Sequence, residues 1–128
     1  MNLLVTSAGR RVKIIEYLKK ALRKIDGKVI AVDCDHRAPA LYFADEFEIV
    51  PRINDENYIQ ILIEICNKYD IKGTFYIPGY IAGLYRELTQ TIVKEDHAVG
   101  LHGYLHESLD HLTEKEEEEI LVKSKEIV

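Results

Sequence analysis

The stretch Lys28-Val29-Ile30-Ala31-Val32 decides the fold, and Asp33-Cys34-Asp35-His36 follows it directly. Its apolar residues are nearly continuous rather than alternating, which is typical of a parallel strand that is buried on both faces. Before it, apolar residues recur at spacings of three and four from Ile14 to Ile25, and Gly27 ends this helical pattern. A helix followed by a buried strand predicts an α/β protein with a parallel sheet.

The alternation of strand and helix continues along the chain. Short apolar runs predict four more strands, at residues 3–5, 47–50, 73–77 and 98–101. Amphipathic patterns predict further helices, at residues 56–69, at residues 81–95 and after the capping box Thr113-Glu114-Lys115-Glu116. The last helix has an inner face of Ile120, Leu121, Ser124 and Val128.

These elements predict one domain over residues 1–128, with halves at 1–71 and 72–128. The expected architecture is a three-layer α/β/α sandwich around a five-stranded parallel sheet of the Rossmann-like or flavodoxin-like type. The order would be 3-2-1-4-5 in a Rossmann-like sheet, although the sequence does not determine it.

The composition sets limits on partners and location. The chain has 128 residues, of which 47% are hydrophobic and 30% are charged, so a globular core is expected. The net charge of -5 argues against a nucleic-acid partner, and no apolar run reaches the ~20 residues that a membrane span needs. Cys34 and Cys66 are expected to be reduced thiols. We therefore expect a cytoplasmic protein, as from recombinant expression, that is a monomer or a homodimer.

Two histidines follow the last predicted strand, in the stretch Gly100-Leu101-His102-Gly103-Tyr104-Leu105-His106-Glu107. Loops at the carboxyl ends of parallel strands are where ligands bind, so His102 and His106 are candidates for two ligands of a zinc site. A catalytic zinc site needs three protein ligands and an open position.

The third ligand is the difficulty for such a site. Asp33 and Asp35 would lie three strand spacings away, at ~14 Å, and His97 would lie at the opposite edge of the sheet. Residues near in sequence could adapt, namely Glu107, Asp110 and His111. The alternative is that the histidine loop is an incomplete site.

A second candidate site is the small-residue loop Thr6-Ser7-Ala8-Gly9-Arg10-Arg11. Such a loop before a helix can bind phosphate through backbone N–H groups, with Ser7, Gly9 and Arg10 as the contacts. It has one glycine instead of the three of the dinucleotide fingerprint, so a tight strand-to-helix turn is the alternative.

Several runs in the first part of the chain form one set: Leu3-Leu4-Val5-Thr6-Ser7-Ala8-Gly9-Arg10-Arg11, Val32-Asp33-Cys34-Asp35, Ala38-Pro39-Ala40-Leu41-Tyr42, Ala44-Asp45 and Val50-Pro51. With them, residues 1–71 resemble the N-terminal, Rossmann-like domain that precedes the ATP-grasp module in carbamoyl-phosphate-synthase-like ligases. The resemblance implies that ligase chemistry resides in the module that follows this domain, and nothing after residue 71 resembles that module.

The second part carries another set: Tyr69-Asp70-Ile71-Lys72-Gly73-Thr74-Phe75-Tyr76-Ile77-Pro78-Gly79, then residues 96–107, then Leu112-Thr113-Glu114. With them, residues 67–128 resemble a fragment of the polysaccharide deacetylase family. The resemblance implies a deformed β/α barrel that binds a divalent metal, usually zinc, with one aspartate and two histidines and removes N-acetyl groups from sugars. His102 and His106 match the histidine motif, whereas the strand with the aspartates has no counterpart.

Two unrelated resemblances in one chain predict a chimera, either engineered or naturally recombined, that folds but has no selected catalytic activity. No cofactor is expected, although zinc is possible. Two alternatives stay open at this point. One is a metal-dependent deacetylase-like remnant with a partial zinc site at His102 and His106, and the other is a phosphate- or nucleotide-binding module at Ser7–Gly9.

Overall fold

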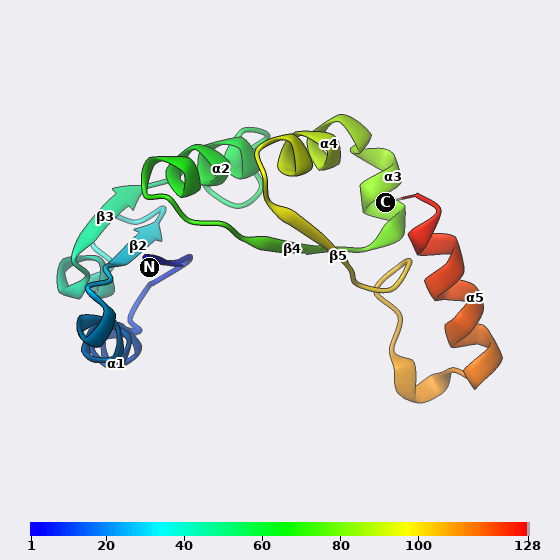
Figure 1. Cartoon of the computed structure of the whole chain (residues 1–128), viewed down its shortest axis with the longest axis horizontal. Helices are drawn as coiled ribbons and strands as arrows, with labels where there is room; N and C mark the ends of the chain where they lie inside the picture. Colours follow the sequence, from blue (N-terminus) through cyan, green and yellow to red (C-terminus); the bar gives the residue numbers. More distant parts are fainter. Residues whose placement is uncertain (128) are drawn as a thin grey trace. The chain divides into compact units, whose positions relative to one another are not determined.

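The computed structural model describes residues 1–127 and divides the chain into two compact units, Met1–Ile71 and Lys72–Val128 (Figure 1). That both units belong to one domain stays a prediction, so each unit is described by itself. Val128, which was predicted on the inner face of the last helix, lies outside the described residues.

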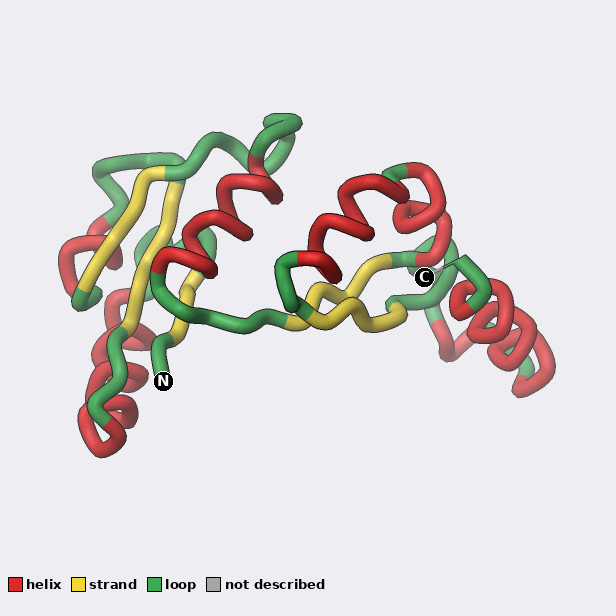
Figure 2. Tube along the Cα trace, turned by 45° about the horizontal axis from the view of Figure 1, so that its top comes forward, coloured by secondary structure: helices red, strands yellow, loops and turns green. Residues whose placement is uncertain are grey.

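The first unit is built on a parallel three-stranded sheet in the order β1-β2-β3 (Figure 2). Leu4 of β1 is paired with Ile30 of β2, and Ala31 of β2 is paired with Phe47 of β3. The elements in chain order, with 3₁₀ helices written η, are β1 (Leu3–Val5), α1 (Val12–Leu22), η1 (Arg23–Ile25), β2 (Val29–Asp33), η2 (Pro39–Phe43), β3 (Glu46–Ile49) and α2 (Tyr58–Lys68).

Strand β2 lies at the centre of this unit. Its residues from Val29 to Val32 are all 0% exposed. Alternate side chains point to opposite faces of the sheet. Ala31 packs with side chains of α1 and η2, whereas Val32 packs with side chains of α2. Helices therefore cover both faces of this sheet, and the predicted α/β class with parallel strands is confirmed.

Helix α1 buries less of its surface than the apolar pattern suggested. Ile15 is 0% exposed and Leu22 is 5% exposed, but Ile14 is 48% exposed and Ile25, in the η1 turn that follows α1, is 53% exposed. The apolar stripe is wider than the sheet face beneath it, because a three-stranded sheet offers a narrow surface. Part of the stripe therefore faces solvent.

The second unit contains the parallel strand pair β4-β5, in which Phe75 lies beside Val99 and Ile77 lies beside Leu101. The elements in chain order are β4 (Thr74–Ile77), α3 (Gly79–Leu84), α4 (Arg86–Lys94), β5 (Ala98–Leu101), η3 (Leu109–His111) and α5 (Glu114–Lys125). The single helix predicted over residues 81–95 is two helices, because the backbone leaves the helical region at Tyr85, with φ -113° and ψ 50°. No helix within residues 1–127 is long and apolar enough to cross a membrane.

The predicted five-stranded sheet is wrong. The described strands form one sheet of three strands and a separate sheet of two. The neighbours β3-β2-β1 and β4-β5 agree with the Rossmann-like order within each sheet, but no pairing joins β1 to β4. An apolar run in the sequence shows that a strand is buried. It does not show which strands pair, because pairing uses backbone hydrogen bonds that any two strands can make.

Buried apolar side chains are scarce in the second unit. Only Ala82 and Ile92 represent it among the buried apolar residues described, while all the others belong to the first unit. Close backbone approach partly takes the place of a core here. Ser124 of α5 is 0% exposed, and its Oγ lies 3.1 Å from the carbonyl oxygen of Gly103. A Cβ atom at Gly79 would lie 3.0 Å from the Cα atom of Ser124.

This contact predicts that Gly79→Ala destabilises the second unit. The added methyl group has no space between α3 and α5, and overpacking of this kind costs about 1–3 kcal/mol. Urea denaturation followed by circular dichroism measures the loss. Gly73→Ala is the matched control, because a Cβ atom there would make only ordinary contacts, at 3.5 Å from the ring of Phe75. Equal stabilities of the two variants would contradict the prediction.

Candidate functional site

The histidine loop follows β5 directly, and the structure brings His102 and His106 together. Their ring centroids lie 4.4 Å apart, with the ring planes at 88°. Both side chains are exposed. The predicted pair therefore forms one small patch of imidazole nitrogen atoms at the carboxyl end of β5.

The backbone of this loop turns sharply in two places. Gly103 has φ 68° and His106 has φ 67°, so both are in the left-handed region, which is strained for histidine. The carbonyl oxygen of Gly103 accepts a hydrogen bond from the N–H of Gly79, and that of Tyr104 accepts one from the N–H of Tyr80, at 3.0 Å each. The first turn of α3 therefore anchors the loop that presents the two histidines.

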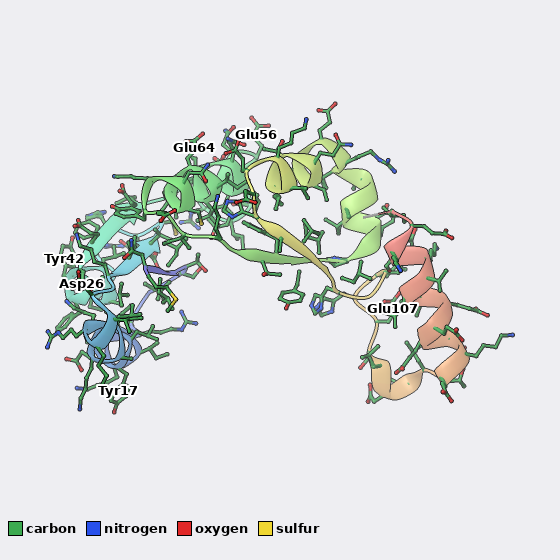
Figure 3. The ribbon with its side chains drawn as sticks, viewed as in Figure 1. Tyr17, Asp26, Tyr42, Glu56, Glu64 and Glu107 are labelled. Carbon is green, nitrogen blue, oxygen red and sulfur yellow. The ribbon has the colours of Figure 1, made fainter. Side chains whose placement is uncertain are left out.

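Glu107, labelled in Figure 3, closes the loop with its carboxylate. Its Oε2 accepts a hydrogen bond from the N–H of Tyr104 and its Oε1 accepts one from the N–H of Leu105, at 2.9 Å each. Desolvation raises the pKa of Glu107, but the backbone hydrogen bonds and the charge of Lys123 outweigh it, so this pKa is lowered. Lys123 also lies over the ring of Tyr104, 3.5 Å from its centroid.

A third metal ligand does not join the histidine pair. Within residues 1–127, no three His, Cys, Asp or Glu side chains are placed to hold a metal ion. Both oxygens of Glu107 are engaged by the backbone, and Asp110 and His111 lie near each other, with 3.6 Å between Oδ2 and Nε2. His97 is buried before β5 and accepts a hydrogen bond from the N–H of Gly73. The residues present do not fit a catalytic zinc ion.

The second candidate loop, between β1 and α1, is held by Asp33. Its Oδ2 accepts a hydrogen bond from the N–H of Gly9 at 2.8 Å, and its Oδ1 accepts one from the N–H of Asp35 at 2.9 Å. Ser7 and Gly9 are in the left-handed region, with φ 49° and 52°. The guanidinium of Arg11 donates to the carbonyl oxygen of Ser7. The side chain at the end of β2 therefore fixes the shape of the loop.

The hydrogen bonds of Asp33 make this loop less suited to the predicted phosphate contacts at Ser7, Gly9 and Arg10. The N–H of Gly9 already donates to a carboxylate, and a negative charge at Asp33 repels an anion. The cleft beside the loop, of about 520 Å³, is lined by Gly9, Arg10, Ala38 and Pro39 and by the charged Asp33, Asp35 and Arg37. Phosphate binding stays a prediction, and Arg10 is an exposed cation that lines this cleft.

Arg37 contributes little positive charge to this cleft, because it is paired. Its Nε lies 3.0 Å from Oδ1 of Asp35. The hydrogen bonds from Arg37 hold the pKa of Asp35 below its usual value. The structural roles of Asp33 and Glu107 were not predicted, and the only sequence signal for them is an acidic residue close to a turn.

The family model for the PylC-like, N-terminal domain matches residues 3–78. This chain belongs to that family. The match covers all of the first unit's strands and extends through β4 to Pro78. It confirms the predicted resemblance of the first part to a domain that precedes an ATP-grasp module.

Two curated proteins are also similar to this PylC-like chain. A peptidoglycan deacetylase from Helicobacter pylori is 37% identical over 67 residues, which are 52% of this chain and 23% of that protein. A peptidoglycan-N-acetylglucosamine deacetylase from Bacillus cereus is 29% identical over 91 residues, which are 70% of this chain and 30% of that protein. The chain thus spans less than a third of the length of either relative. The predicted double resemblance is confirmed, and it is consistent with a chimera.

The two hydrogen bonds to Asp33 predict that Asp33→Asn destabilises the first unit. Asparagine keeps one acceptor oxygen but replaces the other with a donor, and losing a hydrogen bond to a charged group costs about 1–3 kcal/mol. Urea denaturation measures the change in the free energy of unfolding. Asp26→Asn is the control, because Asp26 is exposed and asparagine tolerates its φ of 51°.

The lowered pKa of Glu107 predicts a specific pH dependence. A carboxylate whose pKa is lower in the folded state than in the unfolded state stabilises the fold above its unfolded pKa. This contribution is lost as the pH falls through the folded value. Melting of the wild type and of Glu107→Gln between about pH 7 and pH 3 should show a difference that shrinks as the pH falls. A difference that stays constant would contradict the prediction, and Glu126→Gln is the control.

Proposed function

We propose that this PylC-like chain is an engineered or recombined chimera that serves as a folded α/β scaffold and has no selected catalytic activity. The observation that carries the proposal is the histidine pair: two imidazoles stand 4.4 Å apart, and no third ligand within residues 1–127 is placed to complete a metal site. Function resides in sites rather than in folds, so a segment that carries part of a site does not carry the parent's activity.

The resemblance to deacetylases supports the proposal that the loop with His102 and His106 derives from a protein of that family. Both relatives are named as deacetylases of peptidoglycan, and His102 and His106 match the histidine motif of that wider family. In that family one aspartate completes the metal site. The carboxylate nearest in sequence is Glu107, which closes the loop by accepting two backbone hydrogen bonds. Releasing it to a metal ion would leave two N–H groups without their acceptor.

A second candidate function is a metal-dependent hydrolase remnant. The closeness of the two exposed histidines favours it, because two imidazoles bind zinc weakly and leave open positions for water. The reaction would be hydrolysis of an N-acetyl or ester bond by zinc-bound water. Two protein ligands supply less affinity than the three of a catalytic site, so we expect weak binding and no useful turnover.

A phosphate- or nucleotide-binding function at Ser7–Gly9 has less support. The N–H of Gly9 is used by Asp33, and the neighbouring Arg37 is paired with Asp35. Melting in the presence of phosphate, ATP or NAD would reveal binding as a rise in the midpoint, since a ligand that binds only the folded state stabilises it.

The proposal extends to location and partners. We propose a cytoplasmic protein without a nucleic-acid partner, which is a monomer or a homodimer. The net charge of -5 supports the absence of nucleic acid, and the two cysteine thiols, the exposed Cys34 and the buried Cys66, suit a reducing compartment.

Zinc titration tests the proposed function. We expect the wild type to bind zinc weakly, so that its melting temperature rises only slightly and the gain in free energy of unfolding stays well below the ~2.7 kcal/mol that a ligand gives at 100 times its Kd. His102→Ala and His106→Ala should abolish this rise, and His111→Ala, an exposed histidine, is the control. An N-acetylated chitooligosaccharide incubated with the zinc-loaded protein should release no acetate above the level of His102→Ala. Tight stoichiometric zinc binding with acetate release would establish the hydrolase instead.

A further inference from the structure

The charges of this chain are distributed unevenly. Cations are concentrated in residues 10–26, which contain only two acidic residues, Glu16 and Asp26. These cations are Arg10, Arg11, Lys13, Lys19, Lys20, Arg23 and Lys24. Acids crowd the start of the last helix, at Glu114, Glu116, Glu117, Glu118 and Glu119, where Lys115 alone opposes them. The chain therefore carries two helices with complementary charge.

Helix α1 also has an apolar outer face. Its inner face is buried through Ile15 and Leu22, but Ile14 is 48% exposed and Tyr17 is 70% exposed. Figure 3 shows Tyr17 pointing away from the first unit. Within the described part of the chain, Lys20 of α1 and Lys24 of the following η1 make no ion pair. The outer face thus combines exposed apolar side chains with unpaired cations.

Helix α5 has exposed apolar side chains as α1 does, but acidic side chains are concentrated toward its amino end. Ser124 is buried, whereas Leu121, which was predicted on the inner face, and Val122 are 53% and 52% exposed. Glu118 and Glu114 are exposed about one and two turns before Leu121. Acids lie toward the amino end of this helix and apolar side chains toward its carboxyl end.

We propose that α1 of one copy of this chain docks antiparallel on α5 of a second copy. Placing Tyr17 opposite Leu121 brings Lys20 opposite Glu118, because each lies three residues from the apolar contact. The same register brings Lys24 opposite Glu114, since each is seven residues away. A parallel arrangement would set the cations of α1 against the carboxyl end of α5, where Lys123 and Lys125 lie.

The helix dipoles favour the same direction. The carboxyl end of α1 carries partial negative charge and the amino end of α5 carries partial positive charge, so an antiparallel pair places opposite ends together. Helices α1 and α5 have 11 and 12 residues, or about 17 and 18 Å of length. A contact between two such short helices is small, so the association is weak and depends on exposed charges that salt screens.

Reversing the charges of one helix at a time, and then mixing the two variants, tests the proposal. Sedimentation equilibrium from about 10 μM to about 1 mM protein at low salt should show the wild type associating. The variants Lys20→Glu/Lys24→Glu and Glu114→Lys/Glu118→Lys should each associate at least about tenfold more weakly than the wild type, through repulsion of like charges. An equimolar mixture of the two variants should regain association, because each variant then supplies the helix that the other lacks.

Controls separate this contact from general charge effects. Arg52→Glu/Arg86→Glu changes the net charge by the same amount as Lys20→Glu/Lys24→Glu but at exposed residues outside α1 and α5, so it should associate like the wild type. Circular dichroism verifies that all variants fold. A wild type that stays monomeric throughout, or a mixture that does not regain association, would overturn the proposal. Binding of a monomeric wild type to phosphatidylserine vesicles, lost in Lys20→Glu/Lys24→Glu, would overturn it too and assign the face to a lipid surface.

Discussion

Burial of β2 on both faces is the constraint on which the first unit depends. A strand with no exposed residue from Val29 to Val32 needs a strand on each edge and a helix on each face. β1 and β3 supply the edges, and α1, η2 and α2 supply the faces. The strand also ends in Asp33, whose carboxylate fixes the loop between β1 and α1. One stretch of sequence thus provides both the core and the shape of the nearest loop.

The second unit is organised differently, because it has few buried apolar side chains. Its cohesion comes from specific polar and backbone contacts. Gly79 and Ser124 allow α3 and α5 to approach closely, and α3 in turn holds the histidine loop through two backbone hydrogen bonds. Glu107 closes that loop. Small domains bury a small fraction of their surface, so a unit of this size relies on such contacts more than a large domain does.

Much of this structure could be predicted from the sequence, but the assembly of its sheet could not. All five strands occur within one residue of their predicted bounds, because apolar runs such as residues 98–101 leave little doubt about a strand. Pairing between strands leaves no such mark, so the sheets of three and two strands were not foreseen. The break at Tyr85 was hidden because apolar spacing continues across it. His102 and His106 were found by spacing, whereas the bonds of Asp33 and Glu107 depend on local backbone geometry.

The overlap of the two resemblances explains how one chain can carry both. The match to the PylC-like family continues through β4, and β4 also lies in the run that resembles deacetylases. A strand followed by a helix is a similar unit in both families, since parallel strands are joined by crossovers of one handedness. Sites in such proteins are assembled from loops after several different strands. A join between two families that falls between strand–helix units therefore leaves each unit intact, but it separates residues of a site that come from different units. In the chimera that we propose, His102 and His106 stay together because they follow the same strand, whereas a ligand from another strand is separated from them.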